Sequence, residues 1–221
     1  MTLNPFDQAC RYLLRLDAVG LLAWLLRLPP AEVDFVDWVD TRQVPWPGQP
    51  GRTCDTVAHL RDRGEGGRPW AVVFEFQAEP DELMFGRGLA YLGELWQACK
   101  PTGHRGDRFE VGLVVVNLTG VGRASRRMRL AKAGLRTTLG ALEWNLSTLP
   151  ARRVLRQIEA GDAPRSALTW VPLFQGGDQP GILKKWRQLA EQETDKERRK
   201  TLASRPCSPR RPDAANCGAK R

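Results

Sequence analysis

Histidine is scarce in this sequence, which holds two histidines among 221 residues. A zinc site built from cysteine and histidine is not expected, because none of the five cysteines forms a CxxC pair. The same shortage leaves few candidate bases for a Ser-His-Asp triad. An odd number of scattered cysteines is typical of a reduced protein, and we therefore expect a cytoplasmic location.

Long hydrophobic runs are also lacking. The longest apolar-rich stretch, residues 19–28, is interrupted by Arg27 and is too short to cross a bilayer. The amino terminus has neither the basic start nor the apolar segment of a signal peptide, so we expect no membrane partner. Hydrophobic residues at 42% and charged residues at 27% are typical of an ordinary globular domain, which needs no disulfide or structural metal at this length.

Positive charge is concentrated at the carboxyl end. Residues 195–221 hold nine Lys and Arg against three Asp and Glu, which gives +6 of the net charge of +9. Leu202 is the only large aliphatic residue in 200–221, and no aromatic residue occurs there. Such a segment cannot offset the entropy of ordering, so we expect a domain over 1–199 and a disordered basic tail over 200–221. One hypothesis is that a reading-frame slip produced this tail; the absence of a helix-patterned continuation in the other frames would discard it.

A second basic region lies between residues 120 and 142, where no acid occurs. It contains Arg123, Arg126, Arg127, Arg129, Lys132 and Arg136. Such a run could bind the phosphates of a nucleic acid. A solvated helix face is an equally good explanation.

Hydrophobic periodicity predicts an α/β protein. Helices are expected from Pro5 onward and over residues 17–28, 80–100, 150–161 and 180–199, and strands over 32–41, 54–60, 70–76 and 111–118. The near-continuous apolar run of the last strand predicts a central strand buried on both faces. Residues 44–51 are rich in proline and glycine and predict a loop, whereas residues 134–146 are ambiguous. The interleaved order favours a mixed sheet covered by helices.

Two acids are expected to meet across a hairpin. The turn cluster at residues 63–67 joins strands 54–60 and 70–76, so paired residues have numbers that sum to about 130 and Asp55 falls opposite Glu75. Directly opposed residues have Cβ atoms ~4.5–5.5 Å apart, where two carboxylates repel. A shared Mg²⁺ or Mn²⁺ ion would relieve this repulsion. Protonation of one carboxyl would relieve it as well. Two alternatives to a metal site are that the acids are solvent-exposed at the strand ends, or that a register shift of one residue places them on opposite faces of the sheet.

The same residues resemble a known superfamily. Asp55, a glycine-bearing turn and the run from Val72 to Gln77 resemble the core of the PD-(D/E)XK nucleases, and the Glu-x-Gln ending is similar to that of the recombination-promoting nuclease and putative transposase group. Arg87 and Tyr91 on the following helix, and the apolar strand after it, agree with that group. The resemblance covers roughly residues 5–185 and implies a restriction-endonuclease-like mixed sheet flanked by helices.

This resemblance implies a mechanism. Asp55 and Glu75 would hold Mg²⁺, or Mn²⁺ in its place, with the backbone carbonyl of Phe76 as a third oxygen ligand. Asp7 on the first helix is a candidate additional acid, although an acid at a helix start is equally explained by the helix dipole. Gln77 takes the place of the lysine of the wider superfamily; its amide can orient water but cannot act as a base.

The implied function is that of a metal-dependent DNA endonuclease of the transposase or recombination-promoting type. The alternative is a catalytically inactive nuclease-fold protein that binds a nucleic acid or another partner, such as a mobile-element remnant. DNA is the expected partner, with Arg123, Arg126, Arg127, Arg129 and Lys132 as the expected contacts, and a homodimer is an open alternative.

Overall fold

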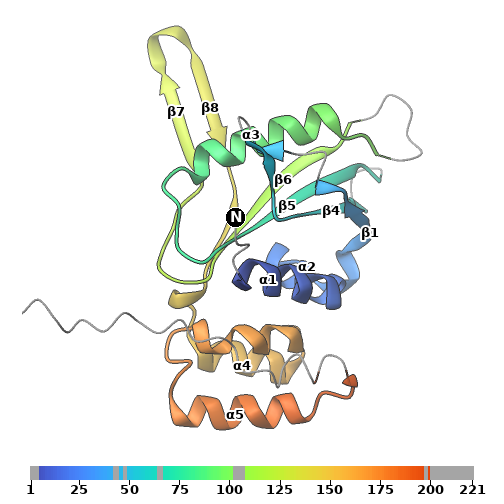
Figure 1. The fold of residues 1–221 in the computed structure, drawn as a ribbon, viewed down its shortest axis with the longest axis vertical. Helices are drawn as coiled ribbons and strands as arrows, with labels where there is room; N and C mark the ends of the chain where they lie inside the picture. Colours follow the sequence, from blue (N-terminus) through green and yellow to red (C-terminus); the bar gives the residue numbers. More distant parts are fainter. Residues whose placement is uncertain are drawn as a thin grey trace, which may run out of the picture.

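The computed structural model describes residues 5–41, 45–46, 49–63, 67–101, 108–196 and 199. It is a mixed α/β protein with a five-stranded sheet between helices (Figure 1), so the predicted class is confirmed. The predicted tail over residues 200–221 lies outside the described residues. None of the described helices has the length and the apolar composition needed to traverse a bilayer.

The sheet has the strand order β1-β4-β5-β6-β9. Its strands are β1 (Asp34–Val39), β4 (Thr56–Arg61), β5 (Pro69–Gln77), β6 (Glu110–Asn117) and β9 (Leu142–Asn145). The β1–β4 and β4–β5 pairs are antiparallel, whereas β6 runs parallel to both β5 and β9. In the β4–β5 hairpin Thr56 pairs with Phe74 and Val57 with Val73, so paired numbers sum to 130 and the predicted register is confirmed.

Helices cover both faces of the sheet. Helices α1 (Pro5–Leu16) and α2 (Ala18–Leu26) lie on one face, and α3 (Met84–Ala98) lies on the other (Figure 1). Because strand side chains alternate, Phe74 and Phe76 pack in the core with α1 and α2, while Val73 packs in the core with α3. Strand β6 contributes side chains to both cores, as its apolar sequence predicts.

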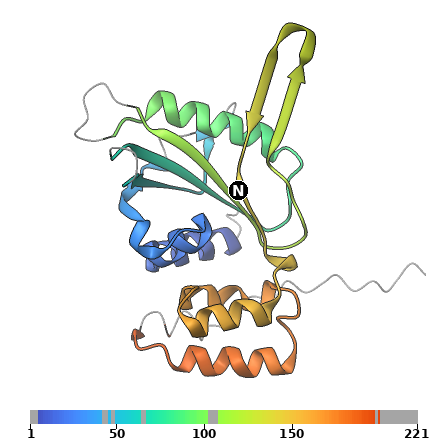
Figure 2. The same ribbon diagram turned by 180° about the vertical axis from the view of Figure 1, so that it is seen from behind.

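A helical layer lies beyond α1 and α2. It consists of α4 (Ala151–Ala160), the 3₁₀ segment η5 (Arg165–Leu173) and α5 (Pro180–Glu191), and its apolar residues continue the core beneath α1 and α2 (Figures 1 and 2). The shorter elements are η1 (Pro30–Glu32), β2 (Pro45–Trp46), β3 (Gln49–Thr53), η3 (Ala131–Ala133) and η4 (Leu146–Thr148). Strands β7 (Arg126–Leu130) and β8 (Leu135–Leu139) form a separate two-stranded ribbon.

Two predicted helices are shorter than expected because side chains compete for backbone groups at their ends. The helix predicted from residue 80 begins at Met84, since Asp81 Oδ1 accepts the Leu83 N–H at 2.8 Å and forms a turn before the helix. The last helix ends at Glu191, and Glu193 Oε1 accepts the Asp195 N–H at 3.0 Å beyond it.

Two other segments also differ from the prediction. Residues 44–51, expected to be a loop, contain β2 and most of β3, which pair with each other. The basic run, for which a helix face was the alternative, forms the β7–β8 ribbon instead. The ambiguous residues 134–146 supply β8 and β9. Backbone pairing decided these cases, because β2 and β3, like β7 and β8, pair as neighbouring segments and β9 pairs with the more distant β6. Hydrophobic periodicity does not report such pairing.

Candidate functional site

Asp55 and Glu75 meet at the point where β4 begins. Strand β4 starts at Thr56, so β5 extends beyond it from Glu75 to Gln77 and pairs there with β6 alone. On the edge of β5 that β4 leaves unpaired, the backbone N–H of Phe76 donates a hydrogen bond to Asp55 Oδ2 at 2.8 Å. In return the Asp55 N–H donates to Glu75 Oε2 at 3.3 Å. The predicted meeting of the two acids is thus present, although both are buried rather than exposed at strand ends.

Each carboxylate also forms an ion pair with an arginine. Arg11 of α1 pairs with Asp55 Oδ1, and Arg87 of α3 pairs with Glu75 Oε1. Together with the two backbone bonds, these contacts give all four carboxylate oxygens a protein donor. The two arginines approach from helices on opposite faces of the sheet, so they supply positive charge to the acids from both sides.

The Arg87 guanidinium is held by further contacts. Its Nη1 donates to Asp81 Oδ2 at 2.6 Å and its Nη2 to the Tyr91 hydroxyl at 3.3 Å. Asp81 also forms the turn before α3, so that turn fixes one end of the guanidinium. Arg87 is therefore positioned by its own helix. Arg11 is more accessible, with 29% of its side chain exposed, whereas 8% of the Asp55 side chain is exposed.

Burial dominates the electrostatics of the pair. Removal from water, followed by the nearby charge of Asp55, raises the pKa of Glu75 to about 8. Burial also raises the pKa of Asp55, although Arg11 and the Phe76 N–H act in the opposite direction. The neighbouring thiol responds in the same way: burial, and then the charges of Glu75 and Asp55, raise the pKa of Cys54 to about 12. The site therefore favours positive charge or a proton.

Gln77 lies on the α3 side of β5, two residues from Glu75, as the strand alternation predicts. Its Oε1 accepts the Asp81 N–H at 3.2 Å, and its Nε2 donates to Met84 Sδ at 2.8 Å. Both ends of the amide therefore contact the start of α3. In this arrangement Gln77 supports the turn that holds Arg87.

The oxygen donors fit a hard divalent cation in type. Asp55 and Glu75 supply carboxylates, and the Phe76 carbonyl faces the same edge of β5 as the Phe76 N–H, toward Asp55. Oxygen ligands of this kind suit Mg²⁺ or Mn²⁺. Within the described part of the chain no cluster of three or more His, Cys, Asp and Glu side chains stands ready for a metal. A bound cation would share these oxygens with Arg11 and Arg87 or take them over.

The other predicted residues lie elsewhere. Asp7 belongs to α1, but its side chain lies outside the described residues. Arg126, Arg127 and Arg129 lie on β7 and Lys132 on η3, and Arg123 precedes the ribbon; all are exposed.

Arg11 is a site residue that the sequence patterns did not predict. A signal for it exists, because residues four apart share a face of a helix and Arg11 follows the candidate Asp7 by four.

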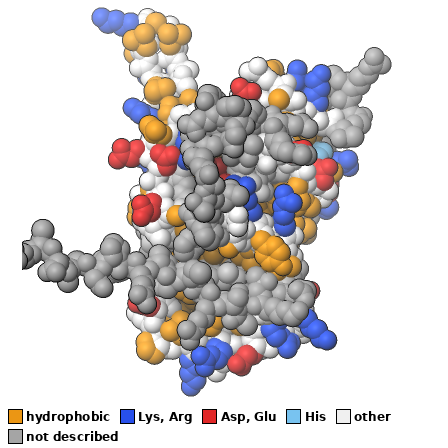
Figure 3. Space-filling model, viewed as in Figure 1, with side chains coloured by type: hydrophobic (Ala, Val, Ile, Leu, Met, Phe, Trp, Pro, Cys, Tyr) orange, Lys and Arg blue, Asp and Glu red, His pale blue; other side chains and the backbone are white. Residues whose placement is uncertain are grey.

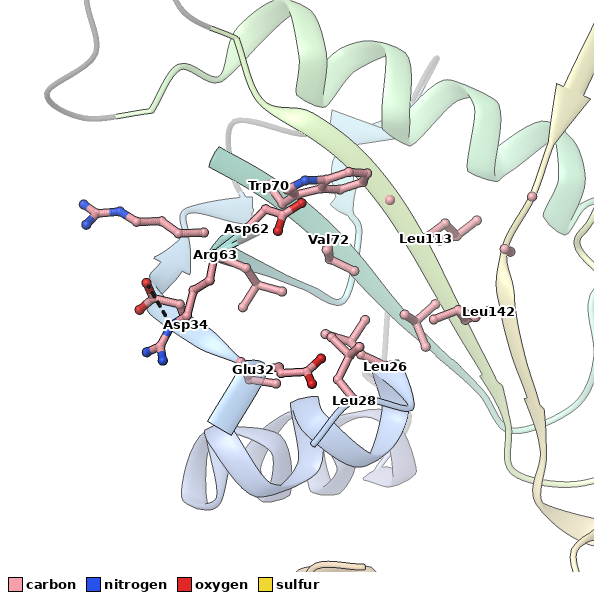
Figure 4. Close-up of a pocket in the computed structure, with 17 residues that line it drawn as sticks. Leu26, Leu28, Glu32, Asp34, Asp62, Arg63, Trp70, Val72, Leu113 and Leu142 are labelled. Atoms are coloured by element: carbon pink, nitrogen blue, oxygen red, sulfur yellow. Dashed lines mark ion pairs between the residues drawn. The ribbon is translucent and has the colours of Figure 1, made fainter. Parts of the chain in front are cut away.

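A mainly apolar cavity lies apart from the two acids. It has a volume of about 780 Å³ and lies between α2 and the beginnings of β5 and β6, with Leu26, Trp70 and Leu113 among its apolar walls (Figure 4). Glu32, Asp62 and the Asp34–Arg63 ion pair line its outer side. Asp55 and Glu75 are not among its lining residues. The acids lie instead toward the carboxyl end of β5, the usual position of ligand sites in open α/β sheets.

Comparisons of the chain with models of known families, with curated proteins and with solved structures find no match.

Proposed function

We propose that this protein is a metal-dependent nuclease that hydrolyses phosphodiester bonds in DNA, with Asp55 and Glu75 as the ligands of Mg²⁺ or Mn²⁺. The meeting of these two acids carries the proposal. A buried pair of carboxylates is costly to maintain, and it is found where positive charge has to be bound. The resemblance of the surrounding residues to the PD-(D/E)XK nucleases supports metal-dependent phosphodiester hydrolysis as the corresponding chemistry.

When bound, the metal ion lowers the pKa of a water molecule and stabilises negative charge on the phosphate. The chain positions the ligands. The Phe76 N–H orients Asp55, the Asp55 N–H orients Glu75, and the Phe76 carbonyl is the third candidate ligand. Arg11 and Arg87, once released from the carboxylates, are placed to pair with phosphate oxygens, for which guanidinium groups are well suited.

A nicking assay on supercoiled plasmid with the full chain tests this proposal. We expect cleavage with Mg²⁺ or Mn²⁺, none with EDTA, and at least a 100-fold loss in Asp55→Asn and in Glu75→Gln. Glu159→Gln is the matched control, because Glu159 lies on α4, half-exposed, and pairs with Lys185. Absence of cleavage by the wild type with both metals would refute the proposal, as would amide variants that cleave at the wild-type rate.

The arginine pairs support a second candidate, a nuclease-fold protein that binds DNA without cutting it. Here Arg11 and Arg87 would be permanent counter-charges, and Gln77 would keep its contacts with α3. Thermal unfolding with and without Mn²⁺ separates the two candidates. Binding of the ion to the folded state raises Tm in the wild type and not in Asp55→Asn if the first is correct. An unchanged Tm together with DNA binding favours the second.

A further inference from the structure

The β7–β8 ribbon projects from the body beyond α3 (Figures 1 and 2). We call this ribbon, with its η3 turn, the arm (residues 126–139). Every residue from 126 to 138 is exposed. Strand side chains alternate, so the arm has two different faces. An exposed two-stranded ribbon gains little from packing, which indicates that its faces serve contacts outside the chain.

One face of the arm is basic. It carries Arg127, Arg129 and Arg136, and Arg129 pairs directly with Arg136 across the two strands. Like charges placed directly opposite destabilise a ribbon. No acid occurs between residues 120 and 142, and none of these three arginines forms an ion pair with another described residue. An anion with repeated charges would relieve this repulsion.

The other face of the arm is apolar toward its tip. Leu130 pairs with Leu135 next to the turn, and Met128, two residues before Leu130 on β7, lies on the same face. The exposed fractions are 59% for Leu130, 62% for Leu135 and 40% for Met128. Figure 3 shows hydrophobic side chains gathered near the end of the arm, with basic side chains beside them. The partner must therefore offer an apolar surface within reach of its negative charges.

The base of the arm is fixed to the helix that serves the acidic site. Arg126 lies over the Phe85 ring, 5.7 Å from its centroid, and the buried Leu139 packs against α3 at Gly88. Arg87 of the same helix pairs with Glu75. The position of the arm relative to Asp55 and Glu75 is thus set by α3.

We propose that the arm holds duplex DNA, with its arginine face on the phosphates and with Leu130 and Leu135 against the bases in a groove. Regularly spaced phosphates beside apolar base surfaces match the two faces, and two-stranded ribbons with apolar tips fit DNA grooves. The arm has no aromatic residue, so it lacks the stacking platform that single-strand binding uses. The choice of DNA rests on the proposed function, but the contact does not require cleavage.

Fluorescence anisotropy of the full chain with a labelled 20-base-pair duplex, in EDTA, tests the arginine face. Replacing Arg127, Arg129 and Arg136 by Gln is expected to weaken binding at least 10-fold and to reduce the slope of log K against log salt by about 2 to 3. The matched control replaces Arg152, Arg153 and Arg156, three exposed arginines of α4, and is expected to change affinity less than 3-fold. Equal losses in the two triple variants would overturn the proposal.

The tip needs a separate readout. The double variant Leu130→Ser and Leu135→Ser is expected to bind the duplex about 5- to 10-fold more weakly with an unchanged salt slope, because it removes no charge. Unaltered affinity, or equal binding of the matching single strand by the wild type, would overturn the proposal. So would tighter arm-dependent binding to phosphatidylserine vesicles, or an arm-dependent dimer in sedimentation velocity. Since the metal is chelated throughout, a failure of the nuclease proposal leaves these results unaffected.

Discussion

The backbone N–H of Phe76 donates a 2.8 Å hydrogen bond to Asp55 Oδ2. This bond links the end of β5 to the residue that precedes β4, and it satisfies a backbone group that would otherwise be buried without a partner. Asp55 therefore completes the sheet edge and at the same time places a carboxylate beside Glu75. The candidate site is built into the sheet itself, so its residues are expected to affect stability as well as the proposed activity.

Arg87 is expected to stabilise the fold through Glu75. At pH 9, where Glu75 has released its proton, Arg87→Gln leaves a buried carboxylate without its ion-pair partner and should lower the free energy of unfolding by about 3 kcal/mol. The double variant Arg87→Gln with Glu75→Gln removes the uncompensated charge and should recover more than half of that loss. Urea denaturation of the four proteins gives the coupling energy. Additive effects of the two substitutions would contradict the expected pairing.

Glu75 is expected to make stability depend on pH. Its pKa is raised from 4.5 to about 8 in the folded protein, so between these values the folded state retains a proton that the unfolded state releases. The free energy of unfolding should therefore fall as pH rises through this window, by up to about 1.4 kcal/mol per pH unit for this group, and level off above it.

Urea denaturation between pH 5 and 9 measures this dependence. Glu75→Gln should show a shallower decline than the wild type, since it removes one of the groups that retain a proton, whereas Glu159→Gln should follow the wild type. Parallel curves for the wild type and Glu75→Gln would show that Glu75 does not titrate as expected.

Two glycines of α3 are expected to respond in opposite ways to alanine. A Cβ at Gly88 would lie 2.7 Å from Leu113 Cδ2 and 2.9 Å from Leu139 Cδ2, so Gly88→Ala should lower the free energy of unfolding by about 1–2 kcal/mol. A Cβ at Gly93 meets no atom within 4 Å, so Gly93→Ala should raise it by about 0.5–1 kcal/mol through helix propensity. Thermal or urea unfolding compares them. The same sign for both substitutions would contradict the close approach of α3 to the sheet.

Cys54 is expected to be unreactive in the folded protein. It is fully buried, and burial together with the adjacent acids raises the pKa of its thiol to about 12, which suppresses the thiolate. Labelling with iodoacetamide at pH 8, followed by peptide mapping, should modify Cys54 only when the protein is unfolded. Native labelling of Cys54 at the rate of a free thiol would show that the site opens readily.

Much of the strand arrangement near the acids could be predicted from the sequence. The turn at residues 63–67 lies close to both hairpin strands, so its position alone specified the pairing of Thr56 with Phe74 and the proximity of Asp55 and Glu75. The apolar run of β6 likewise indicated a strand covered on both faces. These features depend on neighbours in the chain or on alternation along one strand, which a single sequence records directly.

The environment of those acids, in contrast, was decided by tertiary structure. Arg11 lies 44 residues before Asp55, and no local pattern states that α1 brings its guanidinium to that carboxylate. The basic run became a projecting ribbon because β7 and β8 pair with each other, although its composition suited a helix equally well. Sequence alone specified which charges exist and which strand residues face each other. Packing of distant helices determined which charges are buried together, and that burial raises the pKa values of Asp55 and Glu75.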